Sequence, residues 1–248
     1  MRIDILTLFP NMFASLTESI IKRAAEDGQV KIVITDIRDF AQNKHRNVDD
    51  YPYGGGPGMV MQAEPFFLAL EHLRQNSKQR GRVILMSPQG QPFSQQKARQ
   101  LAQEERLFLL CGHYEGIDER VKDALVDEEI SLGDFVLTGG EIPAMAIADA
   151  VVRLLPGVLP AASTAEESFT DNLLEYPQYT RPAEYQGLAV PEILLSGNHE
   201  RIKQWRRKQA LLRTLISRPD LLSKAELTAE EKQFLAAEAK RRQLDDLL

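Results

Sequence analysis

Apolar residues recur along the first part of the chain in two alternating spacings. Short apolar and β-branched runs, typical of strands, occupy residues 2–9, 29–39, 82–87 and 106–112. Apolar residues at helical spacing occupy residues 10–28, 63–75, 94–105 and 116–126. This alternation predicts an α/β fold with a mostly parallel sheet and helices on both faces. The strand runs do not alternate strictly between apolar and polar residues. This agrees with a parallel sheet, because parallel strands are buried on both sides.

The stretch "SLGDFVLTGGEIPAM", residues 131–145, combines two patterns. The apolar run through residues 132–137 predicts one more strand, and the pattern from 142 to 155 predicts the helix that follows. Between them lie Gly139 and Gly140, and Gly133 lies inside the run. Because glycine has no side chain, this segment can come very close to another chain segment or to a ligand.

The pattern changes after Pro156. Residues 156–168 are rich in Pro, Ala, Ser and Thr and have no period, which indicates a linker. Beyond it we expect helices without strands, at 198–218 and 228–248. Thr228 followed by Glu231 predicts a capping box at the start of the second. We therefore divide the chain into an α/β domain (1–160), a linker (161–175) and a small all-helical domain (176–248).

Composition narrows the function classes. The net charge of −6 argues against a protein that coats nucleic acid, although it leaves room for a local basic patch. Residues 199–218 provide one, with seven Lys and Arg against the single acid Glu200, and with Trp205 among them. This basic surface either binds RNA or is an ordinary solvent-exposed face of the helix. The single Cys111, the absence of a signal-like start and of an uncharged run of about 20 residues indicate a cytoplasmic protein without a membrane span.

Three predicted strand ends lead into loops with few side chains: "SPQG" (87–90), "CGHYEG" (111–116) and "SLGDFVLTGGE" (131–141). Ligands of parallel sheets bind at the carboxyl ends of the strands, so these loops predict one site. None of the loops carries a phosphate-binding signature. The first strand also continues into Pro10 rather than a glycine turn, which disfavours a dinucleotide site and the common methyltransferase fold.

Taken together and in order, these loops and the motifs "YGGGPGM", "RLLPGVL", "LLEYPQYTRP", "VPEILLSGNHERIKQWRR" and "RPDLL" closely resemble bacterial tRNA (guanine-37-N1)-methyltransferases of the SPOUT superfamily. The resemblance runs from residue 1 to about 222. It implies a deep trefoil knot in the α/β domain, S-adenosylmethionine as cofactor and a C-terminal domain that binds tRNA. It also implies a homodimer with the active site at the interface.

The resemblance further implies which residues hold the cofactor, mostly through backbone groups. They are Ser87, Pro88, Gly112, Tyr114, Glu115, Gly116, Leu132, Gly133, Asp134, Phe135, Val136, Leu137, Gly139 and Gly140. Glu115 matches a family residue linked to cofactor geometry and to magnesium dependence. Its alternative role is a carboxylate at a helix N-terminus, and the sequence assigns no metal ligand. His113 stands where the family often has arginine.

The acceptor chemistry requires two more groups. Guanine N1 carries a proton, so its methylation needs a base, and a cation near O6 stabilises the developing charge. Arg153 matches the family's arginine for that second role. The family's base is an aspartate directly before Ser-Phe, and this chain has Glu167 there. Glu166 and Asp171 stay open as alternative bases.

Three functions follow as hypotheses. The first is methylation of guanosine 37 at N1. The second is the same cofactor chemistry on another RNA atom, such as a ribose 2′-oxygen. The third is an RNA-binding module without catalysis. The motifs favour the first.

Overall fold

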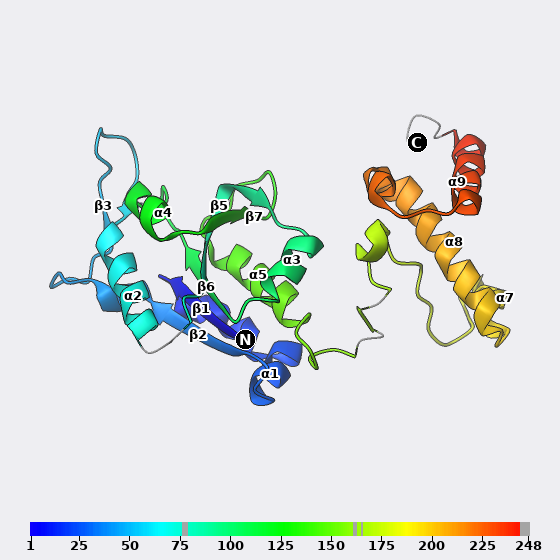
Figure 1. The fold of residues 1–248 in the computed structure, drawn as a ribbon, viewed down its shortest axis with the longest axis horizontal. Helices are drawn as coiled ribbons and strands as arrows, with labels where there is room; N and C mark the ends of the chain where they lie inside the picture. Colours follow the sequence, from blue (N-terminus) through cyan, green and yellow to red (C-terminus); the bar gives the residue numbers. More distant parts are fainter. Residues whose placement is uncertain (76–78, 161–162, 165, 244–248) are drawn as a thin grey trace. The chain divides into compact units, whose positions relative to one another are not determined.

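A computed structural model describes residues 1–75, 79–160, 163–164 and 166–243. The chain divides into two compact units, Met1–Pro160 and Ala161–Leu248, and each is described by itself (Figure 1).

The first unit is built on a five-stranded sheet in the order β2-β1-β6-β5-β7. All four strand pairs are parallel, so the predicted α/β fold with a mostly parallel sheet is confirmed. The strands are β1 (Arg2–Thr7), β2 (Lys31–Asp36), β5 (Arg82–Pro92), β6 (Arg106–Cys111) and β7 (Glu128–Ser131). A separate antiparallel pair joins β3 (Asp49–Asp50) to β4 (Val60–Met61).

Helices cover both faces of this sheet, as predicted. They are α1 (Ser19–Glu26), α2 (Ala63–Gln75), α3 (Gln95–Leu101), α4 (Glu119–Leu125) and α5 (Glu141–Val152), with 3-10 turns η1 (Pro10–Thr17) and η2 (Ile37–Phe40). The central strand β6 alternates between two cores. Leu107 and Leu109 pack with α1, α3 and α5, whereas Phe108 and Leu110 pack with α2 and α4. This alternation is the period of two that a strand imposes.

The sheet also contains a buried ion pair. Arg106 Nε lies 2.7 Å from Asp4 Oδ2, and both side chains are wholly buried. Arg2 contacts the other oxygen, Oδ1, at 2.6 Å. Buried charges need such partners because their desolvation is costly, so the pair pins the start of β1 to the start of β6.

Two sequence predictions in this unit were wrong. The structure has no strand at residues 132–137, where one was expected; β7 lies before this run and ends at Ser131. Phe135 and Val136 are 55% and 85% exposed, so their apolar character reflects a surface loop. The expected helix at 10–28 is two elements, because Glu18 is extended and Ser19 has a positive φ of 55°.

Strand β5 is longer than predicted and contains an excursion. Both Met86 and Gln91 pair with Ile130, so the intervening residues 87–90 loop out of the sheet. A side chain on Gly90 would collide with the backbone of Glu129 and Ile130. The glycine therefore lets β5 return directly against β7.

The second unit is mainly helical. Its elements are η3 (Thr170–Asn172), α7 (Glu192–Leu195), α8 (His199–Ser217), η4 (Pro219–Lys224) and α9 (Ala229–Arg242). The predicted capping box at Thr228 is confirmed. Helix α9 was predicted to reach residue 248, but it ends at Arg242, and residues 244–248 lie outside the described residues.

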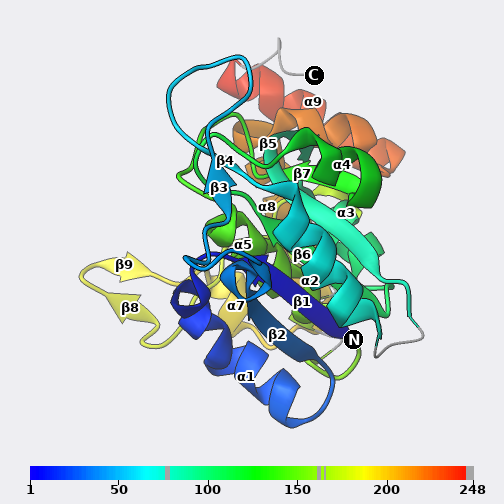
Figure 2. The same cartoon turned by 90° about the vertical axis from the view of Figure 1, so that its left-hand side faces the viewer.

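The expectation of no strands in this part of the chain was wrong. A short hairpin joins β8 (Glu184–Tyr185) to β9 (Leu188–Ala189), turning at Gly187 with a φ of +78° (Figure 2). Two-residue strands carry too few apolar positions to show a period, so the sequence pattern could not reveal them. The predicted linker, 161–175, contains η3, while residues 161, 162 and 165 lie outside the described residues.

Candidate functional site

The three loops predicted from the sequence meet in one cavity of about 420 Å³, at the carboxyl ends of β6 and β7 and at the 87–90 excursion of β5. The predicted cofactor residues that line it are Ser87, Pro88, Gly112, Tyr114, Glu115, Gly116, Leu132, Gly133, Phe135, Val136, Leu137, Gly139 and Gly140. Asp134 does not line it. The structure thus brings together residues up to 53 positions apart in sequence; that they bind a cofactor stays a prediction.

Gly140 shows why this site needs bare backbone. Its N–H donates a hydrogen bond to the carbonyl of Gly112 at 2.8 Å. A Cβ at Gly140 would lie 2.7 Å from Cys111 Cα and 3.0 Å from Gly112 N. Its φ of −81° is accessible to any residue, so close approach of two chain segments, and not a special turn, requires glycine here.

The glycine-rich loop between β3 and β4 is fastened to the second of the three loops. Glu115 N donates to Met59 O at 3.0 Å, and Met61 N donates to Gly116 O at 2.9 Å. Gly58 contacts the Glu115 side chain so closely that a Cβ there would collide with it. The end of the "YGGGPGM" segment therefore packs against Glu115.

Lys122 of α4 is a cavity residue that the sequence analysis missed. Its Nζ donates to Gln89 Oε1 at 3.0 Å and lies 3.6 Å from Glu129 Oε2. It therefore ties α4 to the 87–90 loop and to β7. The signal available in the sequence was its spacing of three from Glu119, which also lines the cavity and lies 3.4 Å from Lys122 Nζ.

Two ionisable side chains at or next to the cavity, Cys111 and Tyr114, have raised pKa values. Burial, followed by the negative charge of Glu141, raises the pKa of the Cys111 thiol well above its ordinary value. Cys111 is therefore a neutral packing group. Burial and a hydrogen bond to Asp49 raise the pKa of the Tyr114 hydroxyl, which stays protonated at neutral pH.

The two predicted catalytic residues lie in different units. Arg153 follows α5 in the first unit and is half-buried, and its N–H donates to Asp149 O at 3.2 Å. Glu167 belongs to the second unit, before η3. Neither unit holds both residues, so their pairing stays a prediction.

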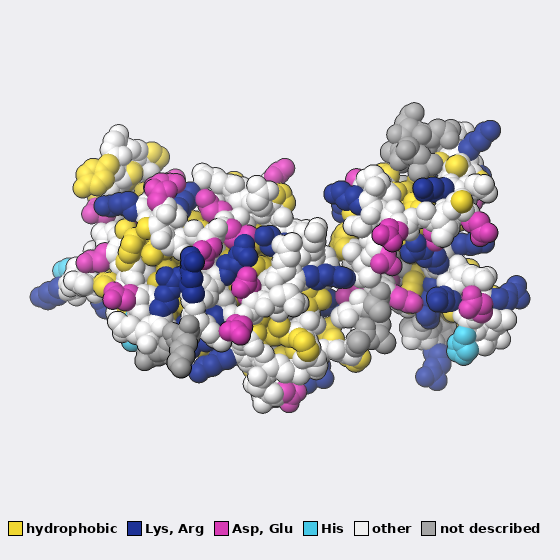
Figure 3. Space-filling model, viewed as in Figure 1, with side chains coloured by type: hydrophobic (Ala, Val, Ile, Leu, Met, Phe, Trp, Pro, Cys, Tyr) yellow, Lys and Arg dark blue, Asp and Glu magenta, His cyan; other side chains and the backbone are white. Residues whose placement is uncertain are grey.

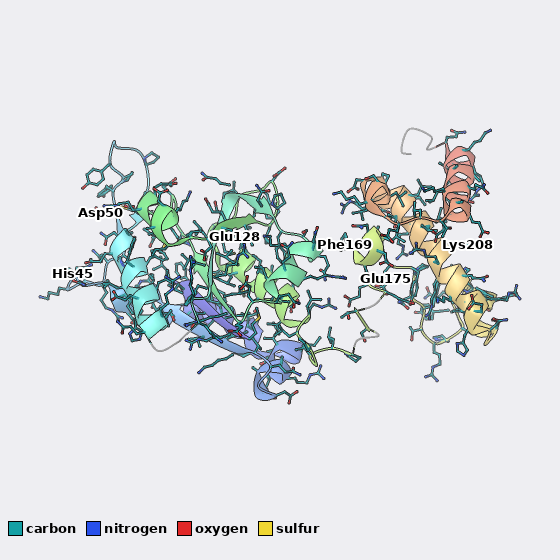
Figure 4. All side chains as sticks on the ribbon, viewed as in Figure 1. His45, Asp50, Glu128, Phe169, Glu175 and Lys208 are labelled. Carbon is teal, nitrogen blue, oxygen red and sulfur yellow. The ribbon has the colours of Figure 1, made fainter. Side chains whose placement is uncertain are left out.

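Glu167 lines a second cavity, of about 380 Å³, inside the second unit. Glu166 and Asp171, the alternative bases, line the same cavity, opposite the basic residues Lys203, Arg206 and Arg207 of α8. Figure 4 labels Phe169 and Glu175 in the segment that carries the carboxylates, and Lys208 on α8. This cavity places all three candidate bases beside the helix that the sequence marked as basic.

The three carboxylates differ in their surroundings. Glu166 accepts a hydrogen bond from the Tyr176 hydroxyl at 2.9 Å and lies 3.9 Å from Arg206. Asp171 lies 4.0 Å from Arg207, and its side chain is 71% exposed. Glu167 is half-buried, whereas the other two are exposed.

Helix α8 combines these cations with aromatic rings. The Arg206 guanidinium lies 4.8 Å from the centre of the Tyr176 ring, and Tyr179 lies 6.5 Å from Trp205. Figure 3 shows Lys and Arg side chains on the visible face of this unit, interspersed with acidic ones. Cations beside aromatic faces are the groups that bind RNA phosphates and bases.

Among the described residues, no three His, Cys, Asp or Glu side chains converge in a way that could hold a metal ion. Within the same residues, no helix is long and apolar enough to cross a membrane.

These features define an α/β protein with a cavity at the carboxyl edge of its sheet and a second unit bearing a basic helix that contains Trp205. The family described as "tRNA (Guanine-1)-methyltransferase TrmD" matches residues 1–224, and the chain belongs to this family. The resemblance inferred from the sequence is confirmed, and with it the enzyme class.

Relatives of full length support this assignment. The chain is 63% identical over 238 residues to the tRNA (guanine-N(1)-)-methyltransferase of Moorella thermoacetica, covering 95% of each chain. It is 60% identical over 238 residues to the protein of the same name from Pelotomaculum thermopropionicum, again covering 95% of each. The Geobacillus kaustophilus protein of that name is 56% identical over 245 residues, covering 98% of this chain and 100% of the relative.

Proposed function

We propose that this chain transfers a methyl group from S-adenosylmethionine to N1 of guanosine 37 in tRNA. The observation that carries the proposal is the convergence of three bare strand-end loops on one cavity, in a chain that belongs to this methyltransferase family. Residues 176–248 bind the tRNA, and the reaction takes place in the cytoplasm.

The cavity fits the cofactor in size and chemistry. A volume of about 420 Å³ falls in the range of small-molecule sites. The backbone of the lining residues 132–133, 135–137 and Gly112 carries N–H and C=O groups, which match the uncharged edge of an adenine. S-adenosylmethionine supplies an already activated methyl group, so the protein has to bind, orient and exclude water.

Glu167 removes the N1 proton of guanine, and Arg153 stabilises the negative charge that develops at O6. A half-buried position in a cavity supports Glu167. Glu166 and Asp171 are both exposed to solvent, which makes them less suitable as the base. A glutamate in place of the family's aspartate adds one methylene of reach.

The knot and the homodimer belong to the same proposal. Close passage of chain segments, at Gly90 beside Glu129 and Ile130 and at Gly140 beside Cys111, supports a knotted chain. Phe135, Val136, Ile142 and Met12 are 55%, 85%, 47% and 43% exposed. A second protomer would cover these apolar side chains and complete the active site. The described residues offer no cluster of His, Cys, Asp or Glu side chains that would hold the magnesium ion implied by the resemblance.

The two alternative functions can be distinguished by the modified nucleoside that the protein forms, if any. Transfer to a ribose 2′-oxygen would use the same cofactor, and an RNA-binding module would transfer nothing. The test is to incubate the protein with labelled S-adenosylmethionine and unmodified tRNA transcripts, digest the RNA to nucleosides and identify the labelled one by mass spectrometry. We expect 1-methylguanosine. A labelled 2′-O-methylnucleoside, or no label at all, would overturn the proposal.

A further inference from the structure

A buried carboxylate lies directly behind the cofactor cavity. Glu141, the first residue of α5, is 1% exposed. Its Oε1 accepts a hydrogen bond from Thr7 Oγ1 at 2.8 Å, and Thr7, at the end of β1, is itself wholly buried. Thr7 Oγ1 in turn accepts a hydrogen bond from Phe9 N at 2.9 Å. Burying a carboxylate is costly, so a residue kept here calls for a role beyond packing.

The second oxygen of Glu141 faces a histidine that lines the cavity. His113 Nδ1 lies 3.9 Å from Glu141 Oε2. This nitrogen is buried and has no hydrogen-bond partner. The imidazole ring is held in place by its neighbours, with the Phe9 ring at 4.8 Å and the Tyr114 ring at 5.0 Å. The cavity wall therefore contains an unsatisfied polar nitrogen about 1 Å beyond hydrogen-bond distance from a carboxylate.

Gly139 is what allows these two groups to face each other. Gly139 and His113 form an antiparallel bridge, so their backbones run side by side. A Cβ on Gly139 would lie 2.5 Å from His113 Nδ1 and would also collide with Glu141 Oε2. The glycine thus leaves open the space in which the imidazole and the carboxylate meet.

We propose that Glu141 is a positioning residue for the cofactor site and acts through His113. When the cofactor fills the cavity, Oε2 accepts a hydrogen bond from His113 Nδ1. Such contacts are often long in ligand-free structures and tighten on binding. The bond fixes the tautomer with the proton on Nδ1, which leaves Nε2 as an acceptor. That acceptor matches the N–H donors of an S-adenosylmethionine-type cofactor, namely its adenine amino group and its ammonium. This inference rests on the proposed function for the identity of the cofactor.

A double-mutant cycle on cofactor binding tests the proposal. The variants are Glu141→Met, which removes the carboxylate at similar volume, and His113→Phe, which keeps the stacked ring but loses Nδ1. The full chain is titrated calorimetrically with S-adenosylhomocysteine, so that no methyl transfer contributes to the signal. We expect each single variant to weaken binding about tenfold. The double variant should also lose about tenfold, because either change already breaks the same contact.

Two further variants separate positioning from a merely structural role. Glu141→Gln keeps an acceptor oxygen and should recover part of the affinity. Thr7→Val removes the hydrogen bond to Oε1; it should lower the melting temperature yet leave the affinity within about threefold. If Glu141→Met does not fold, Glu141→Gln takes its place in the cycle.

Losses that multiply to about a hundredfold in the double variant, or single variants that bind like the parent, would overturn the inference. Failure of the unmodified chain to bind S-adenosylhomocysteine at all would instead overturn the proposed function on which the inference rests.

Discussion

Replacing Gly140 with alanine should weaken cofactor binding strongly while the protein stays folded. The added methyl group would lie 2.7 Å from Cys111 Cα, about 1 Å inside a normal carbon–carbon contact. The obstructing atoms belong to the backbone of β6 and its loop, which cannot rotate away as a side chain can. Relief therefore requires the 138–141 segment to move off Gly112.

The size of the effect follows from two terms. Overpacking of this kind costs about 1–3 kcal/mol, and loss of the hydrogen bond from Gly140 N to Gly112 O adds about 1 kcal/mol. A total of about 2–4 kcal/mol, at a factor of ten for each 1.4 kcal/mol, predicts an affinity lower by a factor of about 30 to 700. We expect the loss in the affinity because residues 138–140 of the displaced segment line the cavity that we propose binds the cofactor.

Gly81→Ala is the matched control, since it overpacks a glycine just before β5 that does not line the cavity. Its Cβ would lie 2.5 Å from Phe108 Cε2. We expect a lower melting temperature and an affinity within about threefold of the parent. Calorimetric titration with S-adenosylmethionine gives both affinities, and thermal unfolding checks the fold. Equal losses in both variants, or parental affinity in Gly140→Ala, would refute the reasoning.

Three further predictions concern charge. Asp4→Asn should lower the free energy of unfolding by about 3–5 kcal/mol in chemical denaturation, because it leaves Arg106 buried without its counter-charge; a loss below about 1 kcal/mol would contradict this. The hydrogen bond from Arg207, at 2.6 Å, lowers the pKa of Glu231. The contribution of this ion pair to the free energy of unfolding is therefore fully present above the ordinary glutamate pKa of about 4.3. It is lost as the pH falls through the lower pKa of Glu231 in the folded protein. Below that pH the free energy of unfolding should depend less steeply on pH in Arg207→Met than in the parent. An unchanged slope would show that this ion pair does not cause the pH dependence. Glu167→Gln should slow single-turnover methyl transfer by about 10²–10⁴-fold and leave cofactor affinity unchanged; an undiminished rate would place the base elsewhere.

Periodicity was enough to predict the parallel sheet and most of its helices. Helix α2 was predicted at 63–75, where the structure has it. Residues 132–137 were misread because exposed and cavity-lining apolar side chains resemble a strand when only their order is known. The excursion of β5 at 87–90 was invisible for a related reason: it depends on which residues pair with Ile130, and pairing is a property of two chain segments.

The parts of the cavity that could be predicted are those formed by residues close together in the sequence. Glycine-rich strand ends pointed to the three loops, and sheet topology explains why they meet. Glu141, Gly139 and His113 show the limit. Their contact joins the N-terminus of α5, the loop before it and the end of β6, and no spacing in the sequence records that distance. The resemblance supplied Arg153 and Glu167, which periodicity alone could not have distinguished from other charged residues.

The most direct test of the proposed function compares two tRNA transcripts that differ only at position 37, one with guanosine and one with adenosine. Each is incubated with excess protein and labelled S-adenosylmethionine for a single turnover, and the labelled position is mapped by nuclease digestion and mass spectrometry. We expect label on the base of guanosine 37, at N1, and none on the adenosine transcript. Equal labelling of both transcripts, or label on a ribose or at another position, would contradict it.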